Sequence, residues 1–305
     1  LLDVCAHLNG QQALPLEPYV EAAAVATGNS DMADVRGQFQ AKRALEVAAC
    51  GRHSLLMVGP PGTGKTMLAS RLPGILPALS RQEQLQVAAI RSISGQKNGA
   101  EQWQQRPFRS PHHTASGVAL VGGGSSPKPG EISLAHQGVL FLDELPEFER
   151  RVLEVLREPL ESGEICISRA SRQVKYPASF QLLAAMNPCP CGYSGDANGR
   201  CHCSPDQVRR YQSRISGPLL DRLDLHIEVT GLQRGELTSA VSNSESSATV
   251  QRRVEQARER QYARRGKVNS LLNTTELEQD CQLTDAHRNL MEQALENLGL
   301  SARAY

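Results

Sequence analysis

One segment of eight residues constrains the fold of this chain more than any other. Gly59 to Thr66 reads Gly-Pro-Pro-Gly-Thr-Gly-Lys-Thr and fits the pattern G-x4-G-K-[ST] throughout. It follows a short apolar run, Leu55 to Val58, and precedes a stretch, Met67 to Leu72, that suits the start of a helix. A buried strand that leads through a glycine-rich turn into a helix N-terminus is an arrangement that binds nucleotide phosphates. The sequence therefore predicts a parallel α/β fold built around a phosphate-binding loop.

Every residue of this loop is a candidate for the nucleotide site. Its glycines let backbone N–H groups turn inward around phosphate oxygens. We expect Lys65 to reach the β and γ phosphates and the Thr66 hydroxyl to ligate Mg²⁺. The alternative is a glycine-rich turn that binds no ligand. The predicted nucleotide-binding residues are Gly59, Pro60, Pro61, Gly62, Thr63, Gly64, Lys65 and Thr66.

Two further apolar runs end in polar residues suited to catalysis. Val139 to Leu142 is followed by Asp143 and Glu144, and Phe180 to Met186 is followed by Asn187. Asp143 is expected to hold the Mg²⁺ ion, and Glu144 to orient or deprotonate the attacking water. Asn187 is expected to hydrogen-bond the γ-phosphate or the water, unless it is only a turn residue before a proline.

The remaining pattern divides the chain into three parts. Residues 1–31 are predicted to be a linker or the tail of a domain that precedes this sequence, 32–231 the α/β core, and 232–305 a small helical lid cut short at its C-terminal end. Sequence periodicity predicts helices at 38–50, 149–161, 248–264 and 284–298, a β-hairpin at 165–176 and a strand at 225–229.

Overall charge does not identify a partner. Lys plus Arg number 33 and Asp plus Glu 32, so the formal net charge is +1. The apolar runs are far shorter than the roughly 20 residues needed to span a bilayer, and no signal peptide is evident at the start. We therefore expect a cytoplasmic protein without a membrane partner.

Four of the eight cysteines form a cluster within residues 187–204. Cys189 and Cys191 make one pair, and Cys201 and Cys203 another. Four thiolates satisfy a tetrahedral structural Zn²⁺ ion, although C-x-C is tighter than the usual spacing. Free thiols, a redox pair and the replacement of one cysteine by His202 are the alternatives. The pair His112 and His113 is expected to be structural rather than metal-binding.

Taken in order, the phosphate loop, Asp143 with Glu144, and Asn187 resemble the motifs of an AAA+ ATPase. The segment Arg214 to Leu225 is similar to the Mg-chelatase and MCM branch of that class. More narrowly, the chain resembles the ComM/YifB family of Mg-chelatase-like proteins. That resemblance is carried by Phe108 to Thr114, Val121 to Gly124 with Pro129 to Ser133, and Asn187 to Tyr193.

The resemblance implies an AAA+ core with β-hairpin insertions and a helical lid, working with ATP and Mg²⁺ as a homo-oligomeric ring, usually a hexamer. It implies that Arg222 is an arginine finger reaching a neighbour's γ-phosphate, unless it only pairs with Asp221 or Asp224. Arg214 is a second interface candidate. Arg303 matches the sensor-2 arginine of the lid.

The resemblance further implies a DNA helicase or translocase that drives branch migration in natural transformation and recombination. Residues 165–217 carry seven Lys or Arg against two Asp, so positive charge gathers there. By position, Arg169, Arg172 and Lys175 on the predicted hairpin would contact DNA phosphates, single-stranded or branched, independently of sequence. The alternatives are a solvated hairpin, a chelatase-type motor that acts on a protein partner without DNA, and a scaffold that binds ATP without turnover.

Overall fold

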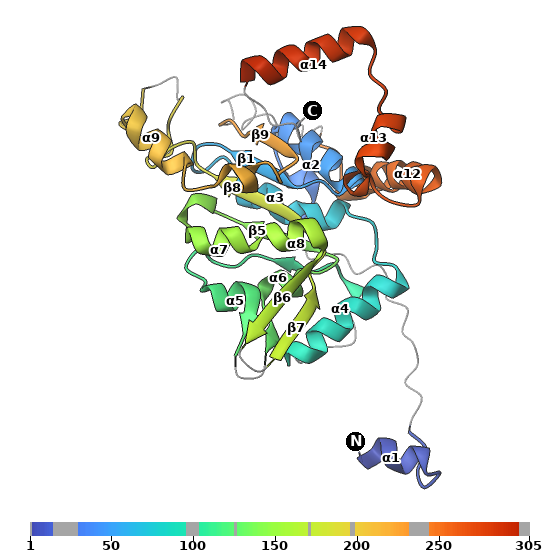
Figure 1. The fold of residues 1–305 in the computed structure, drawn as a ribbon. Coiled ribbons are helices and arrows are strands. Elements are labelled where there is room, and N and C mark those ends of the chain that lie inside the picture. The colour runs from blue at the N-terminus through green and yellow to red at the C-terminus, as the bar shows by residue number, and fades with distance from the viewer. Residues whose placement is uncertain are drawn as a thin grey trace.

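The computed structural model describes residues 2–14, 30–95, 104–124, 127–169, 172–195, 199–231 and 244–298. A five-stranded sheet forms its centre, and every pairing between neighbouring strands is parallel. Helices lie on both sides of this sheet (Figure 1), which confirms the predicted α/β class. In their order across the sheet, the strands are β2 (Phe108–Arg109), β5 (Val139–Leu142), β8 (Gln181–Met186), β1 (Leu55–Val58) and β9 (Leu225–Glu228).

The apolar runs of the central strands supply two hydrophobic cores, one on each face. In β5, Val139 and Phe141 face one side while Leu140 and Leu142 face the other. All four are buried, as expected for a parallel strand covered on both faces. Leu183 and Ala185 of β8 belong to the core that contains Val139 and Phe141, here called the first core. The other apolar residues of β8 belong to the second core, which contains Leu140 and Leu142.

Most of the predicted helices are present near their predicted bounds, and several further helices were not predicted. The helices predicted at 38–50, 248–264 and 284–298 are present as α2 (Phe39–Gly51), α12 (Ser247–Arg265) and α14 (Asp285–Leu298). Of the helices given next, the sequence analysis did not predict α1, α4, α5, α6, α9, α10 and α13. The other helices are α1 (Leu2–Leu8), α3 (Lys65–Ile75), α4 (Arg81–Ser94), α5 (Gly117–Val121), α6 (Glu131–Leu134), α7 (Arg150–Val155), α8 (Arg157–Ser162), α9 (Pro205–Gln212), α10 (Gly217–Leu220) and α13 (Thr274–Asp280), with short 3-10 turns at Met32–Asp34, Leu145–Glu147 and Asn269–Leu271.

The helix predicted at 149–161 is divided in two. Helix α7 ends at Val155 and α8 begins at Arg157. Pro159 lacks a backbone N–H, and its ring would clash with the carbonyl group four residues earlier, that of Val155. One proline therefore explains where the helix is interrupted.

Gly51, at the end of α2, lies against a side chain that follows the helix. It is the last helical residue of α2, and the left-handed residue after it is Arg52, with φ of 60°. A Cβ atom on Gly51 would lie 2.2 Å from the ring of His53. The glycine is therefore needed because the His53 ring packs against its backbone.

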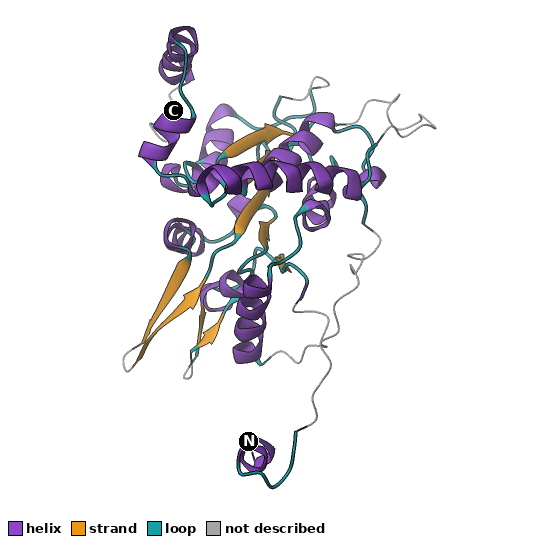
Figure 2. Cartoon of the chain, turned by 90° about the vertical axis from the view of Figure 1, so that its right-hand side faces the viewer, coloured by secondary structure: helices purple, strands orange, loops and turns teal. Residues whose placement is uncertain are grey.

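Two antiparallel hairpins extend from the same side of the core. The predicted hairpin is present as β6 (Glu164–Arg169) and β7 (Arg172–Pro177), and a shorter one pairs β3 (Gly122–Gly123) with β4 (Lys128–Pro129). In Figure 2 they lie side by side and point the same way. The Tyr176 hydroxyl donates to the Pro127 carbonyl at 2.7 Å, so the two hairpins also contact each other.

Helix α12 covers the first core, the one that contains Val139 and Phe141. Its Val250 and Val254 belong to that core, and it packs against α2 and α3. The buried Arg258 donates from Nε and Nη2 to the Ala49 carbonyl at 3.0 and 2.7 Å. None of the helices in the described ranges is long and apolar enough to cross a membrane.

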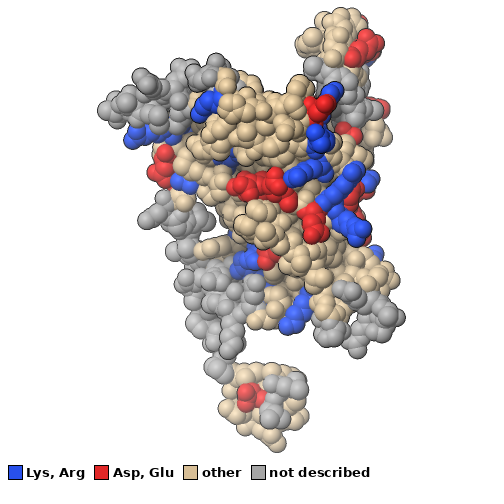
Figure 3. Space-filling model, turned by 90° about the vertical axis from the view of Figure 1, so that its left-hand side faces the viewer, with Lys and Arg blue, Asp and Glu red and all other residues tan. Residues whose placement is uncertain are grey.

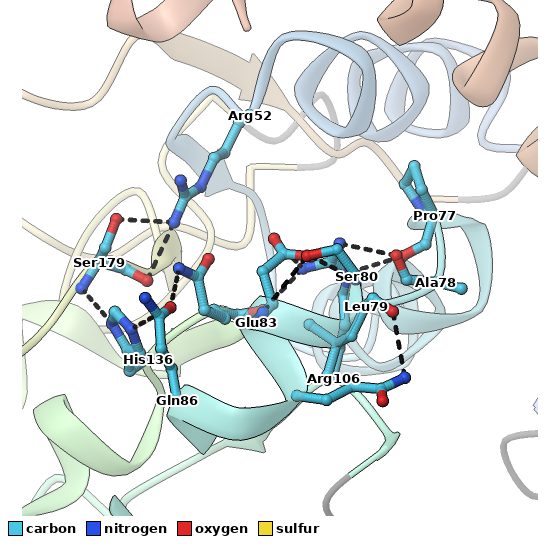
Figure 4. A network of polar contacts seen from close by, with 12 residues as sticks. Arg52, Pro77, Ala78, Leu79, Ser80, Glu83, Gln86, Arg106, His136 and Ser179 are labelled. Atoms are coloured by element: carbon cyan, nitrogen blue, oxygen red, sulfur yellow. Dashed lines mark hydrogen bonds and ion pairs between the residues drawn. The ribbon is translucent and has the colours of Figure 1, made fainter. Parts of the chain in front are cut away.

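A polar network joins the elements at the edge of the sheet where β5 and β8 begin (Figure 4). His136 Nδ1 accepts the backbone N–H of Ser179 at 3.0 Å, and its Nε2 lies 3.2 Å from Gln86 Oε1. Arg52 Nη2 donates to the carbonyl and the hydroxyl oxygens of Ser179 at 3.0 and 2.9 Å. Burial, and then the charge of Arg52, lower the pKa of His136 to about 4.

We expect His136 to make the stability of the protein depend on pH. Its ordinary pKa is 6.5, so the unfolded chain gains a proton before the folded one does as pH falls. The stability is therefore complete above about pH 6.5 and is lost as pH falls toward 4, by at most about 3 kcal/mol. His136→Asn retains an acceptor for the Ser179 N–H but does not titrate. Denaturant unfolding across this range should show a weaker pH dependence for the variant, and equal dependence would contradict the prediction.

Candidate active site

The phosphate loop is held in the backbone conformation that its glycines permit. Gly62 and Gly64 have φ of +78° and +86°, in the region that other residues rarely adopt. A Cβ on Gly59 would lie 2.1 Å from the Val229 carbonyl oxygen, so the loop also needs glycine where it passes the end of β9. Helix α3 then begins at Lys65, with its N-terminus at the loop.

Lys65 is the polar centre of the loop. Its Nζ donates to the Gly59 and Pro60 carbonyls at 2.7 and 2.9 Å and to Asn187 Oδ1 at 3.2 Å. The side chain is buried, and burial lowers the pKa of Lys65 while the nearby Asp143 and Glu144 raise it. The ammonium group thus joins the loop to the residue that follows β8.

Thr66 and Asp143 come together at the carboxyl edge of β1 and β5. The Thr66 hydroxyl donates to Asp143 Oδ2 at 2.5 Å, and the other Asp143 oxygen accepts the Glu144 N–H at 2.9 Å. A hydroxyl and a carboxylate are oxygen ligands of the kind that Mg²⁺ takes in proteins. These two side chains therefore fit the predicted Mg²⁺ site.

Glu144 has a partner that the sequence analysis did not anticipate. It adopts a left-handed φ of 52°, and its Oε2 lies 3.0 Å from His113 Nδ1. The His113 ring in turn meets the His112 ring at a centroid distance of 4.1 Å. The sequence analysis missed this contact because it did not include the pairing of β2 with β5. That parallel pairing brings the residues that follow β2 beside those that follow β5.

The four clustered cysteines converge. Their sulfur atoms all lie within 4.8 Å of one another, and those of Cys189, Cys191 and Cys201 are 3.3 to 3.8 Å apart. A tetrahedral zinc ion with Zn–S bonds of about 2.3 Å sets its sulfurs about 3.8 Å apart. The Tyr193 N–H, followed by the His202 N–H, lowers the pKa of Cys191 to about 6. The spacing of the four sulfurs therefore fits a tetrahedral metal ion.

The cysteine loop lies against the phosphate loop. A Cβ on Gly192 would lie 2.6 Å from Pro61 Cδ, and φ at Gly192 is +87°. Gln212 Nε2, on α9, donates to the Pro188 carbonyl at 3.2 Å and so fixes the base of the cysteine loop. The first part of this loop is therefore tied both to the phosphate loop and to a neighbouring helix.

Of the two predicted interface arginines within the described residues, Arg222 lies apart from the phosphate loop of its own chain. Arg222 precedes β9, whereas the phosphate loop follows the opposite end of the adjacent parallel strand β1. Arg222 forms an ion pair with Glu161. Arg214 donates to Glu147 Oε2 at 2.9 Å, just after the Asp143–Glu144 pair. Arg303 lies outside the described residues.

The predicted DNA-contacting residues lie on the longer hairpin. Arg169 and Arg172 are paired across its end, and Lys175 lies opposite Cys166 in the register. The exposed Lys175 Nζ is 3.6 Å from Glu164 Oε2. The described geometry therefore gathers these positions on one projecting ribbon, away from the nucleotide site.

Comparison with known proteins agrees with this geometry. The family model for magnesium chelatase, subunit ChlI, matches residues 31–237, and the model for its C-terminal part matches residues 244–305. The competence protein ComM of Haemophilus influenzae is 54% identical over 310 residues, covering 100% of this chain and 60% of ComM. The YifB protein of Escherichia coli K12 is 54% identical over 303 residues, covering 99% of this chain and 59% of YifB.

A more distant relative is the magnesium-chelatase 38 kDa subunit of Cereibacter sphaeroides. It is 25% identical over 174 residues, which cover 50% of this chain and 51% of that subunit. The chain thus spans about 60% of the length of its ComM and YifB relatives. Its fold, its phosphate loop and these matches agree: the chain belongs to the magnesium chelatase ChlI family, among the AAA+ ATPases that resemble ComM and YifB.

Proposed function

We propose that the chain hydrolyses ATP with Mg²⁺ at the carboxyl edge of β1, β5 and β8. One observation carries this proposal. Lys65, Asn187 and the Thr66–Asp143 pair are joined by hydrogen bonds although they come from three separate strand ends. Lys65 and the loop N–H groups would hold the phosphates, and Thr66 and Asp143 the Mg²⁺ ion, which neutralises phosphate charge.

Glu144 is the proposed general base. Its carboxylate is half exposed and follows the Mg²⁺ ligand Asp143 directly, so an attacking water can reach it. His113 would fix its orientation through the contact at 3.0 Å. Asn187, already within reach of Lys65, would orient the γ-phosphate or the water.

The proposed output of the ATPase is movement along DNA, as in branch migration during transformation and recombination. The support is the pair of hairpins that project together, with Arg169, Arg172 and Lys175 on the longer one. On the face that Figure 3 shows, Lys and Arg lie among Asp and Glu, so this face has no broad basic surface for binding DNA. Contact through the hairpin therefore accounts for DNA binding better than contact through that face.

We further propose a ring, with Arg222 acting on a neighbour's nucleotide. Arg222 precedes β9 at the edge of the sheet opposite its own phosphate loop, so the nucleotide that it would reach is that of a neighbouring subunit. A hexamer in the cytoplasm, where clustered thiols stay reduced, is the state that we infer. Arg303 would complete the site from the lid.

The second candidate function is a chelatase-type motor that acts on a protein partner without DNA. It is favoured by the similarity to the 38 kDa magnesium-chelatase subunit. Both functions share the ATPase site. They differ in whether Arg169, Arg172 and Lys175 of the longer hairpin bind nucleic acid.

The four cysteines are proposed to hold a structural Zn²⁺ ion. The sulfur separations match a tetrahedral site, and four thiolates leave no open position for a substrate. Because Gly192 packs on Pro61, the metal would also support the phosphate loop.

The ATPase proposal is tested by separating binding from turnover. Lys65→Ala should abolish ATP binding, because it removes the buried ammonium group. Glu144→Gln should bind ATP normally and lose about 10²- to 10⁴-fold in turnover, the usual contribution of a general base. Fluorescent-nucleotide titration and phosphate release measure the two effects. Tight binding by the first variant, or normal turnover by the second, would show that these roles are wrong.

The DNA proposal is tested by replacing Arg169, Arg172 and Lys175 together with Gln. If all three contact phosphates, the slope of log affinity against log salt for single-stranded DNA should fall by about 2. DNA should also lose its stimulation of ATP turnover. A matched triple variant at the exposed Arg252, Arg260 and Arg288 should change neither quantity. Turnover in the parent protein that is indifferent to all DNA would favour the partner-protein motor.

The metal proposal is tested on Cys191→Ser. Metal analysis should find one Zn per chain in the parent and a clear loss in the variant. The variant should also bind the ATP analogue more weakly, because the loop against Pro61 loses its anchor. Cys281→Ser changes an exposed thiol outside the cluster and should keep the metal. Full zinc content in the Cys191 variant would refute a site in which all four thiolates are ligands.

A further inference from the structure

A second polar cavity lies at the opposite edge of the sheet from the phosphate loop. It has a volume of about 200 Å³ and is lined by residues near the start of β1, β5 and β8, with α12 and the turn after it covering the cavity. Gln181, the first residue of β8, lines the cavity, whereas Asn187 follows the last. At about 3.3 Å per residue, β8 separates the two sites by about 20 Å.

The cavity is strongly cationic. Arg52, Arg106 and Arg258 line it, each from a different part of the chain, together with Lys267. Among the described lining residues, Glu83 is the only carboxylate, and its oxygen lies 3.6 Å from Arg106. Lys267 is paired outside the lining with Glu276, at 2.7 Å. Three guanidinium groups, that of Arg258 buried and those of Arg52 and Arg106 partly buried, therefore share one carboxylate.

The three guanidinium groups are held rigidly. Arg106 donates to the Pro77 and Gln137 carbonyls at 2.6 and 2.8 Å. The Nη2 of Arg52 is fixed by Ser179 at 3.0 Å, and two nitrogens of Arg258 by Ala49. Within the described residues, no acceptor uses Nη1 of Arg52 or Nη1 of Arg258. The cations are thus positioned in advance, with donors still available at the cavity.

The local electrostatics favour an anion. Burial is the main cause that lowers the pKa values of Arg52 and Arg106, and the charge of Arg106 lowers that of Arg52 further. Burial, and then the charge of Arg106, lower the pKa of Arg258 to about 10. A bound anion would relieve this repulsion between like charges.

We propose that this cavity binds a small phosphate-class oxyanion between Arg52, Arg106 and Arg258. The volume is below the roughly 300 Å³ at which pockets for drug-sized molecules begin, which suits phosphate or pyrophosphate rather than a whole nucleotide. Guanidinium groups match the geometry of phosphate oxygens.

The bound anion would join the sheet to the helical segment that follows. Arg52 follows α2, Arg106 precedes β2, and Arg258 belongs to α12. An oxyanion held by all three would tie α12 to the amino edge of the sheet. Phosphate should therefore raise the thermal stability of the protein, by mass action on the folded state.

Calorimetric titration with inorganic phosphate tests the proposal, at constant ionic strength with chloride as the balancing anion. A Lys65→Ala background limits binding at the phosphate loop. In this background Arg52→Gln should weaken phosphate binding about tenfold, the usual value of one charged hydrogen bond. Arg260→Gln, an exposed change on α12, is the matched control and should leave the affinity unchanged.

Glu83→Gln is the second variant and keeps the test decisive if Arg52→Gln fails to fold. Glutamine can replace glutamate in the capping box that Glu83 forms with Ser80. Removal of the lining carboxylate should strengthen phosphate binding several-fold. Absence of phosphate binding in the Lys65→Ala protein would overturn the proposal. So would an affinity that neither Arg52→Gln nor Glu83→Gln changes, because the phosphate would then be bound elsewhere.

Discussion

The parallel pairing of β5, β8 and β1 is the constraint on which the rest of the structure depends. Parallel strands end at the same edge of a sheet, so residues that follow them meet even when they are far apart in the chain. Lys65 and Asn187 are separated by 122 positions and lie 3.2 Å apart at their side chains. The two buried faces of the sheet keep this edge in place, because a shift in register would expose the apolar residues of both cores.

The same edge explains why the cysteine loop and the phosphate loop touch. The cysteine loop leaves the sheet directly after Asn187, and Gly192 returns to lie on Pro61. A loop of this composition has little apolar material of its own, and thiolate ligation would replace the missing core. The cysteine loop and the nucleotide site are therefore linked through Asn187, from which the loop starts, and through the approach of Gly192 to Pro61.

The amino edge of the sheet, where the strands begin, carries positive charge. Carboxylates and an asparagine follow the strands at one end, whereas three arginines gather where the strands begin. The network of Arg52, Ser179 and His136 keeps the histidine neutral near neutral pH, since its Nδ1 must accept a hydrogen bond. The two ends of the sheet thus differ in what they can bind, the one suited to a metal-bound nucleotide and the other to an anion alone.

Local sequence determined the elements that rest on short-range pattern. The phosphate loop, the buried strands, the longer hairpin and helices α2, α12 and α14 follow from apolar spacing and glycine positions. Helix α4 was missed although its Ser80–Glu83 capping box was readable. The contact of His113 with Glu144, the approach of Gly192 to Pro61 and the arginine cavity were decided by the tertiary structure alone. Each brings together residues from separate segments, and only strand order and register set their distances; Arg52 and Ser179, for instance, are 127 positions apart.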